Sequence, residues 1–173
     1  FREKDTDVHF HFNMRLGGPY DYLQLKVEDL MKIKELFILI SNNYKDKKFK
    51  LFSELYLRSL EGGKVGLDLR FLLLIMAFES LYLPDENQEV SFRLSVKAAN
   101  ILSKYKFGKP KENYKIIREI YKVRSDLVHN GKTDKLNNRI FSLLTNIVRL
   151  SLIIYLRDKN LFSKSISIEE IIF

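Results

Sequence analysis

Most of this chain is divided into segments whose apolar residues recur every three or four positions, which is the period of an α-helix. Short breaks that contain Gly, Pro or Asn separate the segments. The six segments are residues 23–41, 49–60, 67–83, 90–105, 114–128 and 136–156. Helices of this kind bury their apolar stripes against one another, so the sequence predicts an all-α fold, a helical bundle of five to six helices.

The two ends of the chain have a different pattern. Apolar and polar residues alternate from Val8 to Leu16, and this period of two indicates a strand with one buried face. Gly17-Gly18-Pro19 would end that strand. We therefore expect a short N-terminal β-strand appended to the bundle, completing a sheet formed by sequence outside this chain. Residues 166–173 alternate weakly and are the only other strand-like piece.

A chain of 173 residues is long enough for one well-buried core and too short for two comfortable ones. We expect residues 1–62 to form an N-terminal segment, a strand plus two helices, that is the tail of an upstream domain. Residues 63–160 would form the helical bundle, with its last long helix capped by Asp134. Residues 161–173 would be a C-terminal extension.

The composition excludes some classes of protein. The chain has no cysteine, which excludes disulfides and thiolate metal sites and predicts a reducing, cytoplasmic location. The apolar runs Phe71–Phe78 and Ile147–Leu156 are too short to span a membrane, so no membrane partner is expected. The formal net charge of +8 favours a phosphate-bearing partner such as RNA. A lysine-rich chain carries the same excess on its solvated faces, so charge alone does not decide.

Two features outside the long motif carry some chemistry. His9 and His11 would share one face of the strand, where they are either two ligands of an incomplete metal site or, more simply, part of a solvated surface. Glu79 interrupts the apolar segment from Phe71 to Leu83. A carboxylate there must be paired or hydrogen-bonded. It forms either a structural ion pair with an arginine of a neighbouring helix or a support for a catalytic arginine.

The most informative stretch is Arg124-Ser-Asp-Leu-Val-His129-Asn-Gly131. Histidine transfers protons near neutral pH, and arginine offers a permanently charged fork to phosphate oxygens. The two residues lie about 140° apart on a straight helix, so we expect Gly131 to end the helix and free His129 to turn. Such a pair can cleave RNA through its own 2′-hydroxyl without a metal or cofactor. The alternative is a structural role, with His129 capping carbonyls and Arg124 bridging to Glu79, Glu119 or Asp126.

The stretch from about Leu69 to Gly131 resembles the HEPN superfamily, and most closely the Apea-like HEPN domains of bacteria. The resemblance is carried by three pieces in a fixed order and spacing. They are the acidic helix Ala77-Phe-Glu79-Ser-Leu81, the helix that begins Glu89-Val-Ser-Phe-Arg93-Leu, and the signature Ile120-Tyr-Lys-Val-Arg124-Ser-Asp-Leu-Val-His129-Asn-Gly131. The resemblance implies that residues 63–160 are a HEPN-like bundle that forms a homodimer through its motif helices.

Many HEPN proteins are metal-independent endoribonucleases that act as toxins or effectors in phage defence and toxin–antitoxin systems. Carried onto this chain, the resemblance makes Arg124 and His129 catalytic. The supporting residues would be Glu79, Ser125, Asp126 and Asn130. Ser125 and Asn130 depart from the family pattern, which commonly has Asn, Asp or His after the arginine and Gly after the histidine. An upstream sensor domain or an antitoxin would be the protein partner.

Four cationic residues flank the motif and would bind RNA phosphates: Arg118, Lys122, Lys132 and Lys135. Two other functions remain open. One is a non-catalytic HEPN module for dimerisation or RNA binding, since a fold does not compel catalysis. The other is a helical adaptor that docks a partner domain. The placement of Arg124 and His129 distinguishes the first of these from the nuclease.

Overall fold

The computed structural model describes residues 11–12, 23–24, 27–61, 65–82, 90–131 and 134–163. These residues contain seven helices. They are α1 (Val27–Asn43), α2 (Lys47–Ser59), α3 (Leu67–Tyr82), α4 (Val90–Lys104), α5 (Pro110–Asn130), α6 (Asn138–Arg157) and α7 (Asn160–Ser163). The predicted all-helical bundle is confirmed, and each of the six predicted segments holds one helix. The short helix α7 has no counterpart in the prediction.

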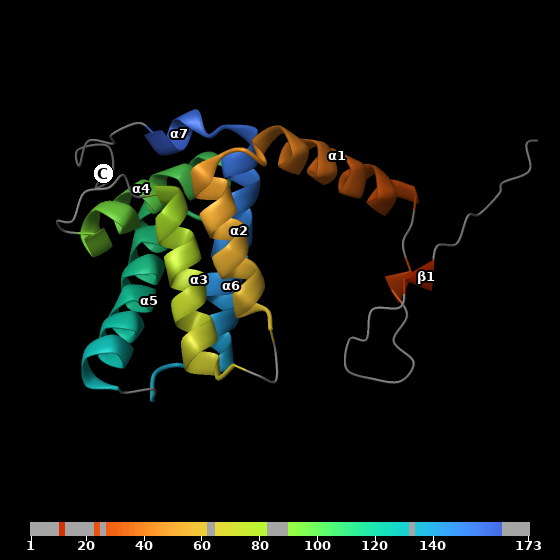
Figure 1. Cartoon of the computed structure of the whole chain (residues 1–173). Coiled ribbons are helices and arrows are strands. Elements are labelled where there is room, and N and C mark those ends of the chain that lie inside the picture. The colour runs from red at the N-terminus through yellow and green to blue at the C-terminus, as the bar shows by residue number, and fades with distance from the viewer. Residues whose placement is uncertain are drawn as a thin grey trace, which may run out of the picture. The chain divides into compact units, whose positions relative to one another are not determined.

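The chain divides into two compact units, residues 1–42 and 43–173. The second unit contains α2 to α7. Helix α2, which the sequence analysis grouped with the N-terminal segment 1–62, packs along α3 and so belongs to the same unit as the rest of the bundle. In Figure 1, α2 and α5 lie on opposite sides of α3, and α6 runs alongside.

Helix α3 is the centre of the second unit. It contacts α2, α4, α5, α6 and α7, and its residues Phe71, Leu74, Phe78 and Leu81 are at most 1% exposed. Helix α6 supplies much of the facing core, with Leu144, Ile147, Val148 and Ile154 buried. Burying apolar area on this scale is the main stabilising contribution to such a fold. The buried tyrosine Tyr82 satisfies its hydroxyl with the Ser151 hydroxyl at 2.8 Å, which joins α3 to α6.

The first unit differs from the sequence prediction at one boundary. Leu23–Gln24 forms strand β2, which pairs antiparallel with strand β1, His11–Phe12. Helix α1 therefore begins at Val27, where Glu28 and Asp29 follow in its first turn, and not at Leu23 as predicted. At these two residues the expected N-terminal strand has a partner inside this chain, and its pairing with sequence outside the chain stays a prediction. The other residues of that strand, and residues 166–173, lie outside the described part.

Both ends of α5 are set by local chemistry. Pro110 opens the helix four residues before the predicted start, because proline lacks the N–H that the first turn leaves unpaired. At the other end Gly131 has φ 61°, in the left-handed region, and its N–H donates to the carbonyls of Asp126 and Leu127. The predicted role of Gly131 as the helix stop is confirmed. For α6 the predicted cap is wrong, since Asn137 and not Asp134 accepts the N–H of Ile140, at 3.0 Å.

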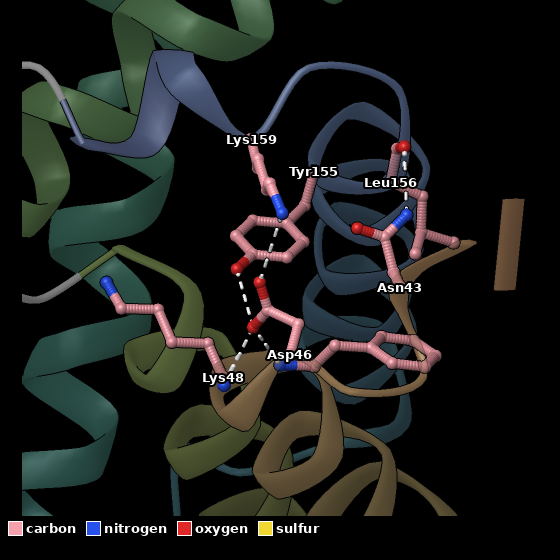
Figure 2. A network of polar contacts seen from close by, with 7 residues as sticks. Asn43, Asp46, Lys48, Tyr155, Leu156 and Lys159 are labelled. Carbon is pink, nitrogen blue, oxygen red and sulfur yellow. Dashed lines mark hydrogen bonds and ion pairs between the residues drawn. The ribbon is translucent and has the colours of Figure 1, made fainter. Parts of the chain in front are cut away.

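A polar network ties the start of α2 to the end of α6 (Figure 2). Asp46 caps α2 by accepting the backbone N–H groups of Lys48 and Phe49, at 2.9 and 3.1 Å. The same carboxylate accepts the hydroxyl of Tyr155 at 3.0 Å and lies 3.7 Å from the Lys159 ammonium. Burial alone would raise the pKa of Asp46, but these donors together hold it below its ordinary value.

Helix α6 is the one helix of the described residues that is long and apolar enough to cross a membrane, judged by length and composition only. Its apolar residues lie against α3 and α4 inside the bundle. A long core helix has the same composition as a membrane span. The position of α6 in the bundle therefore accounts for its apolar character.

Candidate functional site

The signature residues lie in the second half of α5, which is helical without a break through Asn130. Five residues advance an α-helix by about 500°, so Arg124 and His129 project from it about 140° apart. Arg124 is half-buried on the side that faces the bundle, and His129 is exposed in the last turn. Because the helix continues through Asn130, His129 keeps its helical position, and the expectation that Gly131 frees it to turn toward Arg124 is not met.

Arg124 lies beside a hydrogen-bonded pair that joins α3 to α5. The hydroxyl of Tyr121 donates to Oε1 of Glu79 at 2.9 Å, and Tyr121 is one helical turn before Arg124. Burial raises the pKa of the Tyr121 hydroxyl well above its ordinary value, and the charge and hydrogen bond of Glu79 raise it further. The positive charge of Arg124 acts in the opposite direction, which means that the guanidinium is close enough to influence this pair.

Neither proposed catalytic side chain forms a polar contact with the described residues. The structural alternative had Arg124 bridging to Glu79, Glu119 or Asp126, but Glu79 accepts from Tyr121. Within the part of the chain that the structure describes, the side chains of Arg124 and His129 form no hydrogen bond or ion pair. The end of α5 is capped by the backbone of Gly131 and not by the imidazole. Both groups are therefore available to a ligand.

The other predicted supporting residues are spread around the end of α5. Ser125 and Asn130 are exposed, and Ser125 is on the same side of the helix as His129. Asp126 forms an ion pair with Lys135, with 2.6 Å between Oδ2 and Nζ. That pair links Lys135 to α5.

The flanking cations follow the exposed face of α5. Arg118, Lys122 and His129 lie at intervals of four and seven residues, and this spacing puts them on one side of the helix. All three are exposed. Arg118 donates to the Ser91 hydroxyl of α4 at 2.9 Å, which holds its guanidinium at the edge of this face. Lys132 lies outside the described residues.

A groove of about 830 Å³ runs between α5 and α6. Ile116, Val123 and Leu143 contribute apolar atoms to its lining, while Lys122, Lys135 and Arg139 contribute cations. Sequence reasoning identified two of these cations by their distance from the motif, but it did not identify the groove. Each of the two helices packs mainly on another partner, α5 on α4 and α6 on α3.

No cluster of three or more His, Asp or Glu side chains that could hold a metal ion occurs among the residues described above. The pair His9 and His11 is not covered by this statement, because its side chains lie outside the described residues.

Tyr121 is the site residue to which the sequence analysis gave no role. Tyr121 lies within the signature, three residues before Arg124, and this spacing indicates that the two side chains are neighbours on the helix. Its partner Glu79 is 42 positions away, and only the packing of α3 on α5 brings the two together.

Comparisons of the sequence with family models, with curated proteins and with solved structures found no match. The roles given to these residues therefore rest on the geometry described above and on the resemblance in the sequence.

Proposed function

We propose that this chain is a metal-independent endoribonuclease of HEPN type, which acts as a dimeric RNA-cleaving effector in phage defence or a toxin–antitoxin response. The observation that carries the proposal is that Arg124 and His129 form no hydrogen bond or ion pair with the described residues, while the hydrogen-bonded pair of Glu79 and Tyr121 lies beside the arginine. A permanently charged guanidinium without a protein partner is free to bind an anionic ligand such as a phosphate.

The chemistry requires two groups. In the proposed reaction His129 takes the proton of the RNA 2′-hydroxyl, whose oxygen attacks the adjacent phosphorus. The bond from phosphorus to the 5′-oxygen of the next nucleotide breaks, and that oxygen leaves with the proton that the imidazole had taken. Arg124 stabilises the extra negative charge of the crowded phosphorane. The products are a 2′,3′-cyclic phosphate and a 5′-hydroxyl.

The angle between Arg124 and His129 makes a second copy of the chain part of this proposal. On one straight helix the two side chains point about 140° apart, so a composite site needs an arginine and a histidine from facing α5 helices. An exposed apolar stripe next to the site supports such a dimer. Leu69 and Met76 project from the side of α3 opposite its core face, and they are 51% and 50% exposed.

The stripe lies close to the proposed catalytic groups. It ends at Glu79, one turn beyond Met76, and Glu79 is bonded to Tyr121 of α5. Val128, one turn beyond Arg124, is 48% exposed and adds apolar surface at the end of α5. A second copy that covers these side chains would bring its own α5 toward the first, as a two-fold interface requires.

The test is cleavage of labelled single-stranded RNA in EDTA by the parent chain and by the Arg124→Ala and His129→Ala variants. We expect the parent to leave 2′,3′-cyclic phosphate ends and each variant to lose at least about 100-fold in rate. Arg157→Ala is the matched control, because Arg157 is an exposed arginine at the far end of α6. A 3′-hydroxyl product, or loss of cleavage in EDTA, contradicts the mechanism.

The second candidate function is a non-catalytic HEPN module that dimerises or binds RNA. The observation that favours it is the unbroken helix from Arg124 to Asn130, which keeps the two motif side chains apart within one chain. RNA binding by all three proteins, with cleavage by none of them, would support this function over the nuclease.

A further inference from the structure

The groove between α5 and α6 combines an apolar floor with a cationic rim. Val123 of α5 and Ile140 of α6 are nearly buried at its base, and Ile116 and Leu143 extend the floor on either side. Among the described residues, those that line this space leave a volume of about 830 Å³ for a ligand. An apolar floor of this kind accommodates a flat, weakly polar group.

The rim of the groove is positively charged. Lys122, Lys135 and Arg139 line it, against a single acidic side chain, Glu119. Lys135 is already paired with Asp126 at 2.6 Å, whereas Lys122 and Arg139 are exposed and have no ion pair within the described residues. The excess of cations makes the groove complementary to an anionic ligand.

The rim also carries a carboxamide that is suited to hydrogen bonds with a base. Asn146 is exposed on α6, and its side chain has both a donor and an acceptor available to a ligand. Asn137, the other amide of the lining, already accepts the N–H of Ile140 as the cap of α6. Carboxamides of this kind read the edges of unpaired bases.

The groove adjoins the exposed face of α5 that carries His129. Lys122 belongs to both, since it lines the groove and lies seven residues, or two turns, before His129 on the same side. That spacing is about 10 Å along the helix axis. A strand whose phosphate lies at His129 can therefore reach the groove with a neighbouring nucleotide.

We propose that the α5–α6 groove is a nucleotide-binding subsite for single-stranded RNA. The base lies on the floor at Val123 and Leu143, Arg139 and Lys122 bind the flanking phosphates, and Asn146 hydrogen-bonds the base edge. The inference deepens the function proposed above, because it assigns to the same protein the contact that selects which nucleotide lies beside the scissile bond.

The experiment measures binding separately from cleavage. The whole chain is titrated with short 2′-O-methyl homopolymers of uridine, adenosine and cytidine, which lack the nucleophile and cannot be cut by the proposed reaction. Each titration is repeated between about 50 and 200 mM salt, because the dependence of affinity on salt counts the phosphate contacts. Cleavage of RNA with free 2′-hydroxyls is measured in parallel for every protein. His129→Ala is included as the variant that is expected to lose cleavage.

Two groove variants have matched controls. Arg139→Ala is expected to weaken binding about fivefold and to reduce the slope of log affinity against log salt by about 0.7, the contribution of one phosphate of a single strand. Lys50→Ala removes the same charge from an exposed position on α2 and is expected to leave that slope unchanged. Asn146→Ala is expected to reduce the affinity ratio between the best and worst homopolymer at least about fivefold. Asn138→Ala, at an exposed amide of α6 that does not line the groove, is expected to keep the ratio.

The outcomes separate the two proposals. If Arg139→Ala and Lys50→Ala weaken binding equally, or if Asn146→Ala keeps the nucleotide preference, the subsite is wrong even where His129→Ala abolishes cleavage. If the groove variants behave as expected while no protein cleaves RNA, the subsite stands and the nuclease fails. Displacement of RNA by polyglutamate at lower concentrations than by competing RNA would identify an acidic-peptide site and overturn the inference.

Discussion

Replacing Tyr121 with Phe is expected to lower the free energy of unfolding by about 2 kcal/mol near neutral pH. The substitution keeps the ring in the core and removes one hydroxyl, which donates to the Glu79 carboxylate at 2.9 Å. A hydrogen bond to a charged group contributes about 1.5–3 kcal/mol. Glu79 is partly accessible to water, which can replace the lost donor in part, so we expect a value toward the lower end of that range.

The difference in the free energy of unfolding between the parent and Tyr121→Phe is expected to disappear at alkaline pH. Burial, with the charge and hydrogen bond of Glu79, raises the pKa of Tyr121 well above the ordinary value of about 10. Above about pH 10 the unfolded chain therefore loses this proton while the folded chain keeps it, and folding stability falls by about 1.4 kcal/mol per pH unit. The Phe variant has no such proton. At about 1.4 kcal/mol per pH unit, the extra stability of about 2 kcal/mol that the parent has over the Phe variant is lost about 1.5 pH units above pH 10.

The assay is urea unfolding followed by circular dichroism at a series of pH values from about 8 to 11.5, with the two proteins compared at each pH. Comparing the two proteins at each pH cancels the contribution of the lysines to the pH dependence of stability, because lysines titrate in the same range in both. Tyr105→Phe is the control, because Tyr105 is 38% exposed and its substitution is expected to change stability by less than about 0.5 kcal/mol near pH 8. Equal stability of Tyr121→Phe and the parent near pH 8, or a difference that stays constant up to pH 11.5, would refute the reasoning.

Three further perturbations have expected outcomes. Gly131→Ala should lower the free energy of unfolding by about 1–2 kcal/mol, because Gly131 has φ 61° and a Cβ there meets no atom within 4 Å, so the cost is that of the backbone conformation alone. Asp46→Ala should cost about 2–3 kcal/mol, since it removes the cap of α2 and the acceptor of the Tyr155 hydroxyl. The pKa of Asp46 is below its ordinary value in the folded chain, so this contribution is present above about pH 4 and is lost as the pH falls further. Met76→Arg should leave stability within about 0.5 kcal/mol and abolish the proposed dimer, because Met76 is half-exposed on the α3 stripe.

Each of these outcomes has a measurement that can contradict it. For Gly131, the Asn substitution should cost less than the Ala substitution in urea unfolding, and the reverse order would show that the left-handed conformation is not the cause. For Asp46, the stability difference from the parent should shrink between about pH 5 and pH 3, and a constant difference would be inconsistent with the lowered pKa. For Met76, sedimentation of the variant as a dimer would exclude the α3 stripe as the interface.

The sequence predicts the helices well because their signals are local. The apolar period located all six long helices, and Gly131 marked the end of α5. The errors lie at helix starts, where several residues compete. The predicted segment 114–128 omits Pro110, although proline suits the first helical position. Asp134 is predicted as the cap of α6, but Asn137 has that role.

The site is predictable only in part. The signature predicts Arg124 and His129 as site residues by residue type and spacing, and this stays a prediction. The helix continues through Asn130, so the expected turn of His129 away from its position about 140° from Arg124 does not occur. The bond between Glu79 and Tyr121 was not predictable, because it depends on how α3 and α5 are aligned along each other. The same holds for the α5–α6 groove, whose two helices each pack mainly on another partner.

The order of packing in the bundle has a consequence for how the chain folds. The most extensive contacts join helices that follow one another in sequence, α2 with α3 and α4 with α5, whereas α6 must return to α3 across two intervening helices. Local helical hairpins form quickly because little loop entropy is lost, and the distant pairing is slower. We expect the two hairpins to form before α6 docks, so that substitutions in the α3–α6 interface, such as at Ser151, mainly accelerate unfolding in stopped-flow measurements.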